Sequence, residues 1–170
     1  MNARRHEGKL LLHLNVIEAH LLHRILRVIL ENYQATPADL DAPTADVWYS
    51  TRGCRSAKMS DDETRDWLAA LHQVKQTHLR HLDGWATVLA QPKPSGHRLS
   101  LELHHADVLL TALNDYRLMT AARHHVREAE MNLRTEREVI DLPPGRRAAL
   151  MEIHLLAWVI EEVLAALAED

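Results

Sequence analysis

The stretch Ala112–Arg123 reads A-L-N-D-Y-R-L-M-T-A-A-R and sets polar groups inside an apolar helical pattern. A helix turns about 100° per residue, so Asp107 and Arg117 fall within about 60° of the direction of Asn114. The same face carries apolar side chains, namely Leu103, Leu110, Leu118 and Ala121. The pattern therefore predicts a long helix with a polar row on a face that packs against other helices.

This polar row has two interpretations. It is either a buried network, in which Glu161 or Glu162 of the last helix pairs with Arg117, or the floor of a groove for an anion or a peptide carboxylate. The network is the favoured interpretation. The candidate ligand or partner groove consists of Asp107, Asn114, Arg117 and Glu161.

The rest of the chain predicts three more long helices and few strands. Ser60-Asp61-Asp62-Glu63 fits a capping box, in which the Ser60 hydroxyl and the Glu63 carboxylate satisfy free backbone N–H groups. We expect an all-α fold, a helical bundle of about four long helices with a long ordered connection between the first two. The expected helices cover residues 9–33, 60–90, 100–125 and 143–167, and Val47, Trp48 and Tyr49 pin the connection 34–59 across the bundle.

Two details of this expectation concern single elements. The inward stripe of the second helix is expected to be Trp67, Leu71, Val74, His78, Leu82, Trp85 and Leu89. The alternation of Leu99, Leu101 and Leu103 leaves room for a short extended segment before the third helix. Residues 127–138 are expected to form a loop or an exposed helix.

Composition sets the outer limits of the function. The 170 residues are 46% hydrophobic and 26% charged, which predicts one helical domain over residues 1–170, with residues 1–8 a flexible tail. The single Cys54 excludes an internal disulfide, and no signal-like segment is found, so we expect a cytoplasmic protein. Charges in the first helix argue against a membrane span, and the net charge of −4 makes nucleic acid an unexpected partner.

Thirteen histidines raise the question of a metal. Glu102 and His105 have the E-x-x-H spacing of di-iron bundles, and His78 and His81 also lie three apart. Because no second E-x-x-H is present, we expect no metal and no cofactor, with these four residues as the weak candidates. No nucleophile and base can be assigned, Cys54 included, so we predict no catalytic residues and a protein that is not an enzyme.

Leu113-Asn-Asp-Tyr-Arg-Leu118, with Arg123 beyond it, resembles the L-N-D-x-R-L core of an uncharacterised bacterial family, domain-of-unknown-function family 2017. The last helix is similar too, with Trp158 followed by Glu161-Glu162. The resemblance covers the chain loosely and is specific near residues 109–123 and 151–167. It implies a helical cytoplasmic protein without established catalytic activity, and a link to protein turnover, since members are often encoded beside a proteolytic adaptor.

Together these observations predict a non-enzymatic helical interaction or regulatory protein with a protein partner. The first helix has more apolar faces than a monomeric bundle covers, so we expect a homodimer through that helix. The alternative is a small-molecule or metal site inside the bundle, with enzymatic activity.

Overall fold

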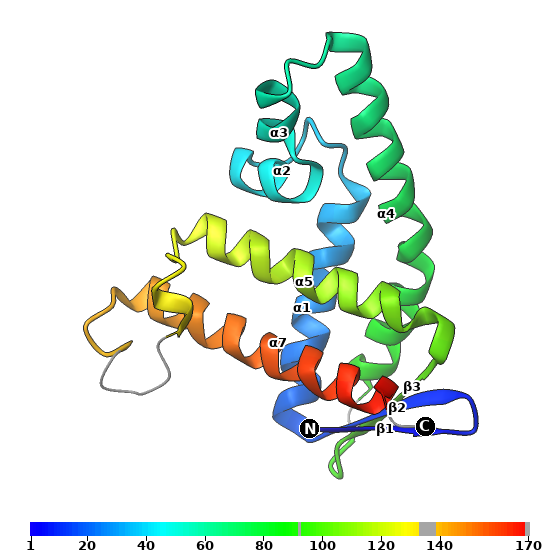
Figure 1. Ribbon diagram of the computed structural model, residues 1–170. Helices are drawn as coiled ribbons and strands as arrows, with labels where there is room; N and C mark the ends of the chain where they lie inside the picture. The colour runs from blue at the N-terminus through cyan, green and yellow to red at the C-terminus, as the bar shows by residue number, and fades with distance from the viewer. Residues whose placement is uncertain (92, 133–138, 169–170) are drawn as a thin grey trace.

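The computed structural model describes residues 1–91, 93–132 and 139–168. Helices dominate, and a small sheet lies at one end of the molecule (Figure 1). The elements in chain order are β1 (Asn2–His6), β2 (Lys9–Leu14), α1 (Val16–Gln34), α2 (Ala42–Tyr49), α3 (Thr51–Ser56), α4 (Asp61–Ala90), β3 (His97–Glu102), the 3-10 turn η1 (Leu103–His105), α5 (Ala106–Arg123), the 3-10 turn η2 (Glu130–Asn132) and α7 (Pro144–Ala168).

The fold is α+β, so the expectation of an all-α bundle is wrong. The described residues contain a three-stranded antiparallel sheet in the order β1-β2-β3, beside six α-helices. The central strand β2 misled the prediction because Leu10, Leu11, Leu12 and Leu14 are all buried. A strand buried on both faces gives a continuous apolar run, which periodicity cannot distinguish from the start of a helix.

Strand β1 occupies residues that were expected to form a flexible tail. It pairs with β2 from Asn2↔His13 to His6↔Lys9. The two residues of the connecting turn, Glu7 and Gly8, have φ of 48° and 75°. Two left-handed residues form the type I′ turn that suits the twist of a hairpin, so the short turn fixes this pairing.

Strand β3 is the extended segment that the alternation of leucines left room for. Leu99 and Leu101 are buried, whereas Arg98 before them and Ser100 between them are exposed. The strand starts directly after Gly96, whose φ is 85°. A Cβ on Gly96 would lie 2.3 Å from the Leu14 carbonyl oxygen, so the turn brings β3 against the end of β2 only with glycine there.

Two capping boxes set the starts of the long helices α1 and α4. The Ser60 box begins α4 as predicted. An equivalent box of Asn15 and Glu18 begins α1 at Val16, seven residues later than the predicted start at Lys9. The connection after α1 holds the short helices α2 and α3, and Trp48 and Tyr49 are buried in the core as expected.

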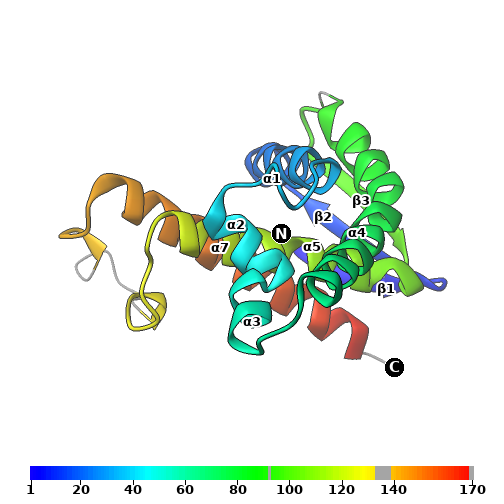
Figure 2. The ribbon, with the colours of Figure 1, turned by 90° about the horizontal axis from the view of Figure 1, so that it is seen from above.

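The long helices form two antiparallel pairs that cross each other. In Figure 1, α1 and α4 run along the long axis of the molecule, and α5 and α7 run across them. Figures 1 and 2 show α2 and α3 at the end of the α1–α4 pair that lies away from the sheet. Helix α2 packs on α5, and α7 packs on β1. This arrangement brings four helices, α1, α2, α4 and α5, around one point.

The predicted inward stripe of α4 holds only in the second half of the helix. Leu82, Trp85 and Leu89 are buried, but Trp67 and Val74 are exposed. Lys75, one residue on from Val74, is buried instead. Among the described residues, no helix is both long and apolar enough to cross a membrane.

Candidate functional site

Lys75 and Asp115 form a buried ion pair where α1, α2, α4 and α5 meet. Their side chains are 8% and 13% exposed, and Lys75 Nζ contacts Asp115 Oδ2. The Tyr33 hydroxyl donates to the same carboxylate oxygen over 2.6 Å. The Trp48 indole N–H donates to the Asp115 carbonyl oxygen over 2.7 Å. One residue of α5 is therefore tied to a residue from each of the other three helices.

Three aromatic rings surround the Lys75 ammonium. Its Nζ lies 4.8 Å from the ring centroid of Tyr33, 5.3 Å from that of Trp48 and 5.6 Å from that of Tyr49. The negative faces of aromatic rings attract a cation at these distances, and more strongly where water is excluded. The rings and the carboxylate together replace the water that the buried ammonium has lost.

A chain of hydrogen bonds extends this cluster along α4. The Gln76 side-chain amide donates to the Tyr33 carbonyl oxygen over 2.7 Å and lies 3.2 Å from His72 Nε2. Because the amide nitrogen only donates, His72 Nε2 is the acceptor and the imidazole proton sits on Nδ1. That nitrogen lies 3.2 Å from the Tyr49 hydroxyl oxygen, to which it donates.

Burial and the Asp115 charge act on the two tyrosines of the cluster. Burial, and after it the neighbouring carboxylate, raise the pKa of Tyr33 far above its ordinary value. The same two causes raise the pKa of Tyr49 to about 12. Both hydroxyls keep their protons at neutral pH, so Tyr33 serves as a hydrogen-bond donor and not as a base.

The cluster locks helices together and is closed to substrates. Tyr33 and Tyr49 are fully buried. The two large hollows of the described surface, one beside β2 and β3 and one between α2, α3 and α5, are not lined by any member of the cluster. The cluster is therefore a buried polar network. Such a network was the favoured interpretation of the predicted polar row, but the residues that form it are different ones.

The residues of the predicted row lie outside this network. Asp107, Asn114 and Glu161 are exposed, and Arg117 is half-buried. No carboxylate among the described residues pairs with Arg117, and its Nε is buried without a hydrogen-bond partner. The expected pairing of Arg117 with Glu161 or Glu162 is wrong, because the neighbouring residue Asp115 points inward and turns this row outward.

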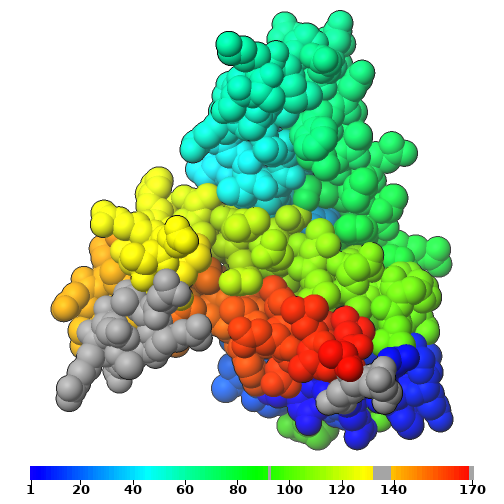
Figure 3. All heavy atoms as spheres, in the orientation of Figure 1, coloured from blue at the N-terminus to red at the C-terminus, as the bar shows by residue number. Residues whose placement is uncertain are grey.

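The row instead lies on the outward side of the antiparallel pair α5 and α7. The Tyr116 hydroxyl donates to Glu152 Oε2 over 3.0 Å and fixes the register between these helices. Asp107 and Glu161 are each nine residues from that contact in opposite chain directions, so they lie at the same level. By the same count Arg117 is level with Met151, and Leu110 with Trp158. The structure thus brings the predicted residues to the outward side of this helix pair. Figure 3 shows α5 and α7 side by side toward the viewer, and η2 packs on the first half of α7, where His154 Nε2 lies 3.0 Å from the Met131 carbonyl oxygen.

Large apolar side chains are exposed on this outward face, defined here as the α5–α7 face. Leu118 is 41%, Met151 61% and Trp158 37% exposed. Met151 and Trp158 are seven residues apart and therefore share a stripe of α7. Leu118 also borders the open hollow of about 820 Å³ between α2, α3 and α5.

The α5–α7 face carries opposite charges at its two ends. Asp107 and Glu161 lie at one end, and Arg117 and Arg147 lie toward the other. On α7, Arg147, Met151, Trp158 and Glu161 fall within about 80° of one another. The face is thus an apolar strip between an acidic and a basic end.

Comparison with known proteins places the chain in one family. The model of a family described as a domain of unknown function, DUF2017, matches residues 1–167. The chain belongs to the DUF2017 family. No curated protein and no solved structure matches it. The family that the resemblance indicated is therefore shown, and it brings no activity with it.

In this DUF2017 protein, part of the weakly predicted metal set comes together. The ring centroids of His81 and His105 are 3.8 Å apart, and those of His104 and His105 are 4.0 Å apart. Burial, and after it the neighbouring cationic groups, led by His105, lower the pKa of His81. His78 lies on the same helix, one turn before His81. Glu102 is exposed and pairs with Lys9 over 3.2 Å.

The rings of these neighbouring histidines are tilted, by 39° between His81 and His105 and by 49° between His104 and His105. In the part of the chain that the structure describes, no three His, Cys, Asp or Glu side chains are arranged to hold a metal ion. Cys54, the other chemically reactive candidate, is buried in α3 with a free thiol.

Sequence reasoning missed Lys75 and Asp115 for one shared reason. It took Asn114 as the inward direction of α5 and Val74 as an inward position of α4, and each choice was one residue, or about 100°, away from the buried side chain. The signal was present in the Asn114-Asp115 pair and in Trp48 and Tyr49, since a buried cation needs both a carboxylate and aromatic neighbours. Charged residues are rarely fully buried, so a charged residue beside an apolar stripe is normally assigned to the exposed side of the helix.

Proposed function

We propose that this protein is a non-enzymatic interaction protein that works as a homodimer, with the α5–α7 face as its dimer interface. The observation that carries the proposal is the exposure of Trp158 and Met151 on one stripe of α7. Tryptophan and methionine are enriched at protein interfaces, and tryptophan is among the residues that carry most binding energy there. Three of the nine large apolar side chains exposed among the described residues lie on this face.

Charge indicates a second copy of the chain as the occupant of the face. In a two-fold dimer the same patch faces itself, so residue i contacts residue j and j contacts i. The acidic end with Asp107 and Glu161 then lies against the partner's basic end. A face with opposite charges at its ends is complementary to its own rotated copy.

Helix α1, the dimer interface expected from the sequence, exposes less apolar surface for a second copy of the chain. Seven of its residues are buried within one chain, by α4 above all. Its large exposed apolar side chains are Val16 and Ile17, both in its first turn. The breadth of its apolar surface reflects its central position in the fold, so the proposed interface moves from α1 to α5 and α7.

Light scattering of three proteins at micromolar concentration tests the interface. The wild type is expected to give about twice the chain mass of 19.4 kDa. Trp158→Glu places a charge in the centre of the strip and is expected to give the monomer mass. Ile17→Glu is the matched control, because Ile17 is 72% exposed and lies on α1. It is expected to keep the dimer.

The outcomes separate the interfaces. A monomeric wild type contradicts the homodimer. A monomeric Ile17→Glu beside a dimeric Trp158→Glu moves the interface back to α1. Circular dichroism of each variant establishes that a change of mass is not a loss of folding.

The proposal of a protein without catalysis rests on the state of its titratable groups. Burial raises the pKa of Tyr33 far above its ordinary value, and Tyr33 lies inside the closed cluster around Lys75. A group with an unusual pKa marks a reactive site only where a substrate can reach it. A location in the cytoplasm and a role in protein turnover belong to the same proposal and are supported by the sequence features and the family resemblance.

A further inference from the structure

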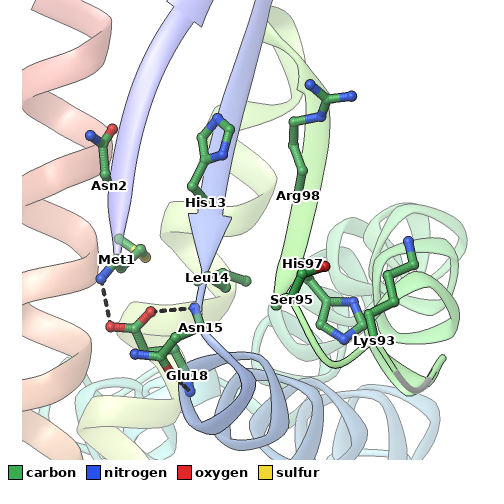
Figure 4. Close-up of a pocket in the computed structure, with 11 residues that line it drawn as sticks. Met1, Asn2, His13, Leu14, Asn15, Glu18, Lys93, Ser95, His97 and Arg98 are labelled. Atoms are coloured by element: carbon green, nitrogen blue, oxygen red, sulfur yellow. Dashed lines mark hydrogen bonds and ion pairs between the residues drawn. The ribbon is translucent and has the colours of Figure 1, made fainter.

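A hollow of about 690 Å³ opens between the ends of β2 and β3 and the start of α1. Its lining includes His13, His97, Arg98, Lys93 and Glu18 (Figure 4). Asn2, His13 and Arg98 are cross-strand partners in adjacent strands, so their side chains form a row across one face of the sheet. This hollow is separate from the α5–α7 face and from the cluster around Lys75.

Positive charge prevails in this hollow. Lys93 and Arg98 contribute two permanent cations, and both are exposed. Glu18 is the carboxylate among the lining residues, and both of its oxygens are engaged. Its Oε2 accepts from the Asn15 backbone N–H over 2.8 Å, and its Oε1 lies 2.5 Å from the Met1 amino group. The dashed lines in Figure 4 show these contacts turned away from Lys93 and Arg98.

Two imidazoles of the hollow hold polar atoms without partners. His97 is 7% exposed, and its Nδ1 makes no hydrogen bond. His13 Nε2 is likewise buried without a partner. These are two of the four such atoms among the described residues. Both residues line the hollow, His13 from the sheet face that carries Arg98 and His97 from the opposite face. An unsatisfied buried polar atom is costly, so native structures keep few of them, and those they keep call for an explanation.

We propose that this hollow binds a phosphate group, either free phosphate or that of a small phosphomonoester. Phosphate oxygens accept from the Arg98 guanidinium and the Lys93 ammonium, the two kinds of cation that recognise phosphate in proteins. The imidazoles of His13 and His97 line the same hollow, and each has a ring nitrogen without a hydrogen-bond partner that is free to donate to a phosphate oxygen. A dianion matches two permanent cations beside a carboxylate that is already engaged.

Titration with inorganic phosphate, followed by NMR of the histidine imidazoles, tests the site in the full chain. We expect saturable shifts of the His13 and His97 ring signals, with a dissociation constant in the millimolar range that suits an open site. The exposed His6 ring is expected to stay unshifted. A parallel titration with glycerol 3-phosphate identifies the source, because an ester binds as well as free phosphate only if the hollow admits its carbon chain.

Charge variants decide whether the binding belongs to this hollow. Lys93→Gln and Arg98→Gln are each expected to weaken phosphate binding about tenfold, since each removes a charged hydrogen-bond partner. Lys58→Gln is the matched control, because it removes the same charge in the link between α3 and α4, at the other end of the molecule (Figure 1). Equal binding by the wild type and both hollow variants overturns the proposal, as does the absence of any saturable shift.

Discussion

At the scale of single residues, Asp115 organises the interior. Its carboxylate forms an ion pair with Lys75 and accepts a hydrogen bond from the Tyr33 hydroxyl. Its backbone carbonyl oxygen accepts a hydrogen bond from the Trp48 indole N–H. Loss of this side chain leaves a buried ammonium without its counter-charge, whereas the exposed neighbour Asn114 has no such role. Substitution of Asp115 is therefore expected to destabilise the fold strongly, and the same substitution of Asn114 is expected to have little effect.

Asp115→Ala is expected to lower the free energy of unfolding by about 3 to 5 kcal/mol, the scale for removing one half of a buried ion pair. Asn114→Ala, the matched control, is expected to change it by no more than about 0.5 kcal/mol. Urea denaturation of both variants measures the difference. Equal losses would show that the cluster does not hold the helices together.

His78 makes the stability depend on pH. Burial lowers its pKa, Lys75 adds to this effect, and the carboxylates of Asp107 and Asp115 oppose it. The folded pKa thus lies below the unfolded value of about 6.5, so the unfolded chain binds the proton more readily. The contribution of His78 to stability is present above that value and is lost as the pH falls through the folded pKa.

Denaturant midpoints at pH 7.5 and 5.5 test this sign. The wild type is expected to lose more stability between the two values than His78→Gln does. His81, whose pKa is also lowered, accounts for part of the loss that remains in the variant. If His78→Gln loses as much stability between pH 7.5 and 5.5 as the wild type, the pKa of His78 is the same in the folded and unfolded states, which contradicts the prediction.

At the scale of elements, two glycine turns define the sheet. Gly8 and Gly96 both have positive φ, but only Gly96 lies against backbone, at the Leu14 carbonyl oxygen. Gly8 has nothing within 4 Å of its missing Cβ. The turn at Gly8 therefore needs only a residue that adopts positive φ. The turn at Gly96 needs positive φ and also a residue without a Cβ.

Gly8→Ala is expected to cost about 1 kcal/mol, the strain of a left-handed alanine. Gly96→Ala is expected to cost about 3 kcal/mol, because strain adds to the clash with Leu14. Thermal or urea unfolding of the two variants measures the contrast. Equal costs would mean that β3 does not approach the end of β2 as closely as described.

The elements that have local sequence signals were predicted correctly. The prediction was wrong where a residue is buried by segments that are distant in the sequence. The capping box of Ser60 and the apolar stripe at Leu82, Trp85 and Leu89 were read correctly because both are local patterns. The leucines of β2 were read as helix, since their burial depends on β1, β3 and the helices behind them. Likewise, Lys75 is buried because α1, α2 and α5 pack around it, which no pattern within α4 reveals.

At the scale of the whole molecule, the fold turns its charged row outward. The crossing of two helix pairs encloses the Lys75 cluster and leaves α5 and α7 on the outside of the molecule (Figure 3). The α5–α7 face has acidic residues at one end and basic residues at the other. The hollow beside β2 and β3 lies at the ends of these strands, next to the start of α1. We thus propose one outer surface for self-association and a separate polar hollow for phosphate, both outside the buried Lys75 cluster.

Spin labels report most directly on the central proposal that two copies meet through the α5–α7 face. A label on Asn114→Cys lies in the middle of that face, and a label on Arg65→Cys lies on α4, away from it; Cys54 is buried and stays unlabelled. Electron–electron dipolar spectroscopy of the two singly labelled proteins is expected to give a short distance between copies for position 114 and a longer distance, or none, for position 65. A short distance at 65, or no distance between copies at 114, would contradict the account.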